Sequence, residues 1–152
     1  MTDSDYPDGP RLRELFLAEK ELYDRLIELA GRQMSCIAAT DEKGFMAVVA
    51  EKQVLIDRLD IIEKELKNVK ADWLTVRDGI EPDLVPEIES IASEIEVAIK
   101  VLLEADEGSQ KKLQKQRGEM LDRIRSAQAG KAAARSYAPK PIEDNRFLDE
   151  RT

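Results

Sequence analysis

Hydrophobic residues recur at helical spacings in three separate stretches of this 152-residue chain. In the first stretch, apolar positions from Leu12 to Ile37 follow one another at intervals of one, three and four residues. This broad apolar face predicts a helix over 11–39 that packs against more than one neighbour. Thr40 and Asp41 come next, and both residue types cap helix N-termini well. Because this turn is short, the second helix should run back along the first.

The second stretch has the most regular pattern in the sequence. Ten positions step alternately by three and four residues, and nine of them are apolar: Phe45, Val48, Lys52, Leu55, Leu59, Ile62, Leu66, Val69, Trp73 and Val76. A seven-residue repeat of this length predicts a coiled-coil seam along one helix at 42–77. We interpret Lys52 as a register device or solvated edge of the seam, and Trp73 as core or as a cap on the end of the helical bundle.

A break and a third helix complete the pattern. Gly79 should end the second helix by adopting the left-handed conformation, and Pro82 should keep the following residues from continuing it. A third helix is predicted over 86–128, with Pro86 in its first turn. Its apolar residues are dense as far as Leu103 and sparse afterwards. Since this helix is longer than the first two, part of it should extend past them, bend or fray.

The sequence therefore predicts an all-α fold, an elongated antiparallel three-helix bundle with coiled-coil packing. The bundle is a single domain at 11–129, preceded by a frayed lead-in at 1–10. A flexible or extended tail follows at 130–152, where Pro139 and Pro141 interrupt any helix.

The amino-acid composition of the chain excludes several classes of functional site. The chain has no His and one Cys, so Cys/His zinc sites, disulfide frameworks and His-based acid–base catalysis are excluded. We expect no enzymatic activity, no cofactor and no metal, and we interpret Cys36 as a small hydrophobic residue of the core. No run of about 18 apolar residues is present to insert into a membrane, so we expect a soluble, cytoplasmic protein.

Charge divides the chain into two parts. Residues 1–109 contain 13 Lys and Arg against 26 Asp and Glu, whereas residues 110–152 contain 11 against 6. The net charge of −8 argues against nucleic acid as the main partner. The basic end is the part expected to meet an acidic surface.

The sparse half of the third helix is the candidate binding site. Leu113, Met120, Leu121 and Ile124 lie along one side of the predicted helix. An amphipathic helix with an uncovered apolar side can receive a partner helix. Two alternatives remain open, namely that the first two helices extend to cover this side, or that a second copy of the chain does.

The order and spacing of several short motifs resemble a known family. These are Glu21-Leu22-Tyr23 with Leu26, then Asp41, then Glu51-Lys52-Gln53 before Leu55, and later LLEADEGSQKKLQKQRGEMLDRI, GKAAARSY and a tail with RFLDER. Together they resemble the FlgN-type flagellar export chaperones, over roughly residues 12–150.

The resemblance implies a function. Chaperones of this type hold the disordered amphipathic terminal segment of hook-associated proteins, which form the hook–filament junction, and deliver them to the type III export gate. It implies that substrate binds around Leu113, Met120, Leu121 and Ile124, and that Tyr137 docks on the gate, although Ala138 and Pro139 depart from the Tyr-Gly start of that motif. Competing interpretations are a FliT-like filament-cap chaperone and a coiled-coil adaptor or scaffold acting as a homodimer.

Overall fold

The computed structural model describes residues 6–134, with side chains described as far as Gly130, and these residues form helices and no strands. The helices are α1 (Gly9–Ala39), α2 (Glu42–Ala71), α3 (Trp73–Asp78) and α4 (Leu84–Ala134). The predicted all-α class is confirmed for this part of the chain. Tyr137 and the rest of the predicted tail beyond Ala134 lie outside the described residues.

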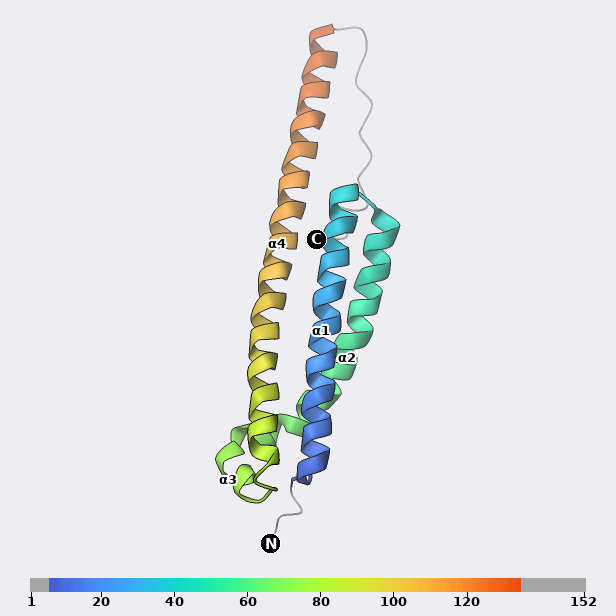
Figure 1. Ribbon diagram of the computed structural model, residues 1–152. Coiled ribbons are helices and arrows are strands. Elements are labelled where there is room, and N and C mark those ends of the chain that lie inside the picture. The colour runs from blue at the N-terminus through green and yellow to red at the C-terminus, as the bar shows by residue number, and fades with distance from the viewer. Residues whose placement is uncertain (1–5, 135–152) are drawn as a thin grey trace.

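The three long helices run side by side along a common axis (Figure 1). α1 packs against both α2 and α4, as its broad apolar face predicted. α2 runs opposite to α1, and the short α3 carries the chain across to α4, which runs in the same direction as α1 (Figure 1). At about 1.5 Å per residue, the 51 residues of α4 span about 77 Å, which makes the molecule elongated.

α1 begins earlier than predicted. The Oδ1 atom of Asp8 accepts a hydrogen bond from the Arg11 amide at 2.9 Å, and Pro10 lies in the first turn, where its missing N–H costs nothing. The hydroxyl of Tyr6 donates to Asp72 at 2.7 Å. Residues 6–10 of the predicted lead-in are therefore part of the folded domain.

The predicted single helix over 42–77 is interrupted at Asp72. The backbone of this residue departs from helical geometry, with φ −110° and ψ 29°, and its carboxylate is held by Tyr6. The seam residues on both sides of the break still face inward, and Leu66, Val69 and Val76 are buried. The Trp73 ring packs edge-on against Phe16, with 6.2 Å between the ring centroids.

The ends of α1 and α3 differ from the prediction in which residue adopts the left-handed backbone conformation. Gly79 ends α3 with φ −99°, so the left-handed conformation expected there is wrong. Thr40, at the end of α1, adopts that conformation instead, with φ 53°. The cap predicted next to it is confirmed, because Asp41 accepts a hydrogen bond from the Gly44 amide at 2.9 Å.

The core is one long cluster shared by all the helices, with a small second cluster at one end. The long cluster contains the buried residues Leu12, Leu15, Phe16, Leu22, Tyr23, Leu26, Leu29, Val48, Leu55, Leu59, Leu66, Val69, Val76, Ile88, Ile91, Ile95 and Ala98. Ile37, Phe45 and Leu113 form the second cluster, where the α1–α2 turn meets α4. Cys36 is half-buried and packs against both clusters, as expected of a small hydrophobic residue.

Candidate functional site

The α1–α2 turn covers α4 as far as Gln116. Leu113 packs against Ile37 and Phe45 and is 3% exposed. The side-chain amide of Gln116 donates to the backbone carbonyl of Ile37 at 2.7 Å, and so satisfies a carbonyl in the last turn of α1. These contacts mark the last point at which the other helices bury residues of α4.

The structure divides the four predicted binding residues. Leu113 belongs to the core, so the expectation that its side chain is free for a partner is corrected: Phe45 and Ile37 reach farther along α4 than helix lengths suggested. Met120 and Ile124 are half-buried, and Leu121 is 40% exposed. These three residues remain available on the surface. Tyr137 is outside the described residues.

Beyond Gln116, α4 continues past the α1–α2 turn (Figure 1). We call residues 117–134 the overhang; they span about 27 Å at the standard helical rise. From Arg117 to Gly130 no described side chain is buried. Part of the third helix does extend past its neighbours, as its length predicted, and both Gly108 and Gly118 lie within the continuous helix.

The apolar residues of the overhang continue the inward-facing side of α4. Steps of three, four or seven residues connect the buried or half-buried positions Leu102, Ser109, Leu113, Gln116, Met120 and Ile124. Since residues three and four apart share a helix face, Met120 and Ile124 lie on the side that is packed lower down. The overhang therefore presents an extension of the core surface to solvent.

The overhang and the turn before it are basic. Residues 110–134 contain seven Lys and Arg against two Asp and Glu. Arg117 and Arg123 are exposed, and Arg125 is paired with Asp122 at 3.7 Å on the exposed surface. The surface thus combines apolar side chains with positive charge, which suits an amphipathic segment that carries acidic residues.

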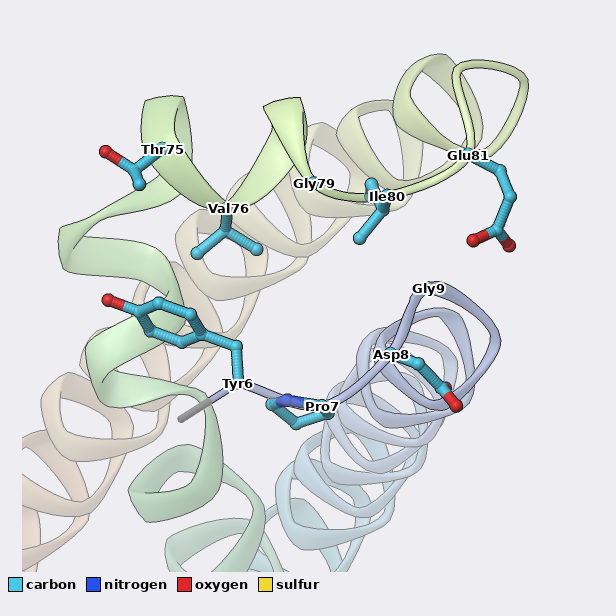
Figure 2. Close-up of a pocket in the computed structure, with 9 residues that line it drawn as sticks. All are labelled: Tyr6, Pro7, Asp8, Gly9, Thr75, Val76, Gly79, Ile80 and Glu81. Atoms are coloured by element: carbon cyan, nitrogen blue, oxygen red, sulfur yellow. The ribbon is translucent and has the colours of Figure 1, made fainter. Parts of the chain in front are cut away.

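The opposite end of the molecule has a cavity of about 590 Å³. Figure 2 shows the lead-in residues Tyr6–Gly9 on one side of it and the α3 segment around Val76 and Ile80 on the other. Its carboxylates are Asp8, which caps α1, and Glu81. Within the described residues no three Cys, Asp or Glu side chains are placed to hold a metal ion.

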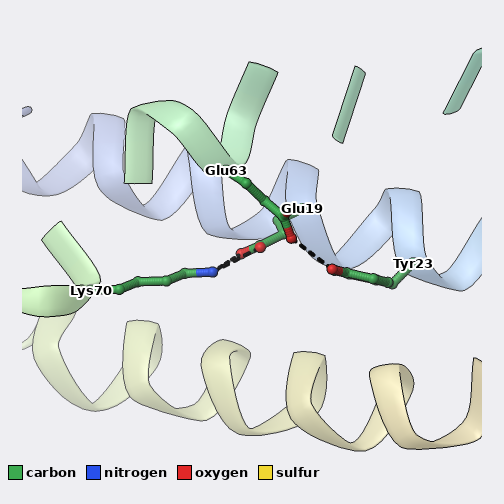
Figure 3. A network of polar contacts seen from close by, with 4 residues as sticks. All are labelled: Glu19, Tyr23, Glu63 and Lys70. Atoms are coloured by element: carbon green, nitrogen blue, oxygen red, sulfur yellow. Dashed lines mark hydrogen bonds and ion pairs between the residues drawn. The ribbon is translucent and has the colours of Figure 1, made fainter. Parts of the chain in front are cut away.

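A polar network inside the helical packing was missed by the sequence analysis. Glu19 has no exposed surface, and its two carboxylate oxygens accept from the Lys70 ammonium at 3.0 and 2.8 Å (Figure 3). Next to it, the Tyr23 hydroxyl donates to Glu63 at 2.7 Å. The sequence contains a pattern that could have indicated the burial of Glu19. This residue lies three positions after Phe16 and four before Tyr23, in the middle of the apolar face of α1.

Burial governs the titration of this network. Desolvation raises the pKa of Glu19, against the lowering effect of the hydrogen bond and the charge of Lys70, while the nearby Glu63 raises it further. Burial and the hydrogen bond to Glu63 also raise the pKa of the Tyr23 hydroxyl. Both hydrogen-bonded pairs of the network connect α1 to α2.

Lys52 and Trp73 have polar partners across the helices. The ammonium of Lys52 donates to Gln33 on α1 at 3.1 Å and to Asp106 on α4 at 3.3 Å. Lys52 therefore connects α1 and α4 from its position on α2. The indole N–H of Trp73 donates to Glu89 at 2.8 Å, so the ring links α3 to α4 as part of the core.

Comparisons of the chain with protein-family models, with curated proteins and with solved structures found no match. Among residues 6–134, no helix combines the length and apolar character needed to cross a membrane. The overhang is the candidate binding surface that the described residues support best.

Proposed function

We propose that this protein is a cytoplasmic, non-enzymatic chaperone of the FlgN type for flagellar type III export. It would bind the disordered amphipathic terminal segment of a hook-associated protein of the hook–filament junction and deliver it to the export gate. The sequence motifs that resemble this family support the proposal. The observation that carries it is the overhang, where the apolar face of α4 continues beyond α1 and α2.

The overhang has the properties that capture of a helix requires. Met120 and Ile124 continue the core face of α4, so a partner helix lying beside them would take the place that α1 occupies lower down. A disordered segment pays an entropic cost when it orders on binding. The affinity should therefore be moderate, which allows the substrate to be released at the gate.

The remaining parts of the proposal concern packing and the tail. We propose that α1, α2 and α4 form a three-helix bundle in which the seam of α2 packs as a coiled coil. Tyr137 would dock on the export gate, with the basic C-terminal region steering the complex toward an acidic surface.

The first prediction tests substrate capture. Met120→Asp combined with Leu121→Asp should weaken binding of a purified hook-associated protein about 100-fold, because losing two apolar contacts costs about 3 kcal/mol. Isothermal titration with the full-length proteins measures this loss. A matched control, Val97→Asp with Leu103→Asp, places the same charges on exposed positions of the covered part of α4. Full affinity in the overhang variant would overturn the assignment of the site.

A homodimeric scaffold is the second candidate, and the outer side of α2 favours it. Met46, Val49 and Ile56 share one exposed line at three- and seven-residue spacings, which a second copy of the chain could cover. Light scattering separates the two candidates, since a stable dimer that Ile56→Glu dissociates would support the scaffold. Binding to a filament-cap protein in preference to a hook-associated protein would instead support the FliT-like alternative.

A further inference from the structure

The residues that follow the overhang in the sequence include an acidic stretch. Ala134 is the last described residue of α4, and 18 residues follow it. Among them, residues 142–150, IEDNRFLDE, contain four acidic residues against one Arg, together with Ile142, Phe147 and Leu148. We call this stretch the acidic segment; it lies outside the described residues.

The acidic segment complements the overhang in both charge and hydrophobicity. Residues 110–134 carry seven basic side chains against two acidic ones, around the apolar Met120, Leu121 and Ile124. The acidic segment carries the opposite charge around its own apolar residues. Opposite charges at the rim of an apolar contact favour one orientation and speed the encounter.

The connection is long enough for the two to meet. From Ala134 to Ile142 the chain spans at most about 29 Å when extended. The overhang is about 27 Å long, so the acidic segment can lie beside any part of it after the chain reverses. The connection contains Pro139 and Pro141, and proline is unfavourable in the interior of a helix.

We propose that the acidic segment docks along the overhang of its own chain, with Phe147 and Leu148 covering Met120, Leu121 and Ile124. Its carboxylates then face Arg117 and Arg123. Because the acidic segment belongs to the same chain as the overhang, its effective concentration there is about a millimolar, so weak contacts are enough for docking within the chain. The acidic segment is a more suitable occupant than a second copy of the overhang, which would oppose like charges.

Docking has a regulatory consequence, which rests on the proposed function. A partner helix that binds the same face must displace the acidic segment, so its apparent affinity is reduced by the fraction of molecules in which the face is free. The overhang would thus be covered until a substrate segment competes for it.

Hydrogen exchange of the full-length protein tests docking without any substrate. Phe147→Glu with Leu148→Glu should speed amide exchange of residues 117–130 about tenfold, as expected when a segment docked in about nine molecules of ten is released. A control variant, Ser136→Glu with Ala138→Glu, adds the same charge outside the acidic segment and should leave exchange unchanged. Equal exchange rates in the wild type and the Phe147/Leu148 variant would overturn the proposal.

Charge exchange tests the pairing itself. Arg117→Glu with Arg123→Glu should speed exchange in the overhang, as should Asp149→Arg with Glu150→Arg, and the two changes combined should restore the protection. If each variant by itself speeds exchange but the combined variant does not restore the protection of the overhang, the pairing is rejected. Protection that disappears on dilution would show docking between copies and reject docking within the chain. Because no partner is added, these outcomes are independent of whether the capture experiment succeeds.

Discussion

Glu19 is a carboxylate buried inside the helical packing. Its carboxyl group has no exposed surface and is surrounded by the apolar face of α1, with Lys70 and Glu63 as its charged neighbours. A buried charge is tolerated when it is paired and hydrogen-bonded, and Lys70 supplies both interactions. The sequence shows this Glu within an apolar pattern, but only the packing of α2 on α1 shows its partner.

The pH dependence of stability should reveal this burial. Burial raises the pKa of Glu19 above its ordinary value of 4.5 in the folded state, so the folded state binds a proton more tightly than the unfolded state does. The stabilisation that results from this difference is complete below pH 4.5. That contribution is lost as the pH rises through the folded-state pKa. The free energy of unfolding of the wild type, relative to Glu19→Gln, should therefore fall as the pH rises above 4.5.

Urea unfolding at a series of pH values measures this difference. Glu28→Gln, on the exposed side of α1, is the matched control for the loss of one carboxylate. A Glu19→Gln difference that rises with pH would mean that the ion pair with Lys70 dominates over desolvation, contrary to the expectation.

At the scale of the elements, periodicity predicted which faces are buried better than where helices end. The seam of α2 is buried or half-buried at every position, and it keeps its register across the break at Asp72. At the break, the Asp72 carboxylate accepts a hydrogen bond from Tyr6, which is 66 residues away in sequence, so no local pattern could indicate this contact. The end of α1 was not predicted in detail either, because Thr40 rather than a glycine adopts the left-handed conformation there.

Thr40 stores strain that a single substitution should relieve. It is a β-branched residue with φ 53°, a conformation that costs an L-residue about 1–2 kcal/mol and that glycine adopts freely. Thr40→Gly should therefore raise the free energy of unfolding by about 1 kcal/mol, measured by urea denaturation. Thr40→Ala retains the Cβ atom and should give less of this gain. Destabilisation by Thr40→Gly would show that the Thr side chain contributes more than the strain costs.

At the scale of the whole molecule, the unequal lengths of the helices create the overhang. α4 is 51 residues long, whereas α1 has 31 and α2 has 30. Unequal helix lengths predicted that part of the third helix extends past its neighbours, bends or frays, and Leu113 was expected to be uncovered, whereas it is buried. The small cluster of Ile37, Phe45 and Leu113 closes the packed region one turn before Gln116 and so separates the covered part of α4 from the free part.

Leu113 should accordingly behave as a core residue. Leu113→Ala should lower the free energy of unfolding by about 2–4 kcal/mol, because it leaves a cavity between α4 and the α1–α2 turn. Leu121→Ala, on the overhang, should change it by less than about 0.5 kcal/mol. Chemical denaturation compares the two, and equal effects would contradict the boundary drawn at Gln116.

The sequence by itself determined the all-α class, the inward face of each long helix and the cap at Asp41, because these follow from spacing and residue chemistry within a few positions. It also indicated a basic, sparsely packed end of the chain. Only the tertiary structure decided that Leu113 is core while Met120, Leu121 and Ile124 remain on the surface, and that Glu19 is paired with Lys70. The reason is physical: burial and pairing depend on how far neighbouring helices reach, which is decided where residues distant in sequence meet.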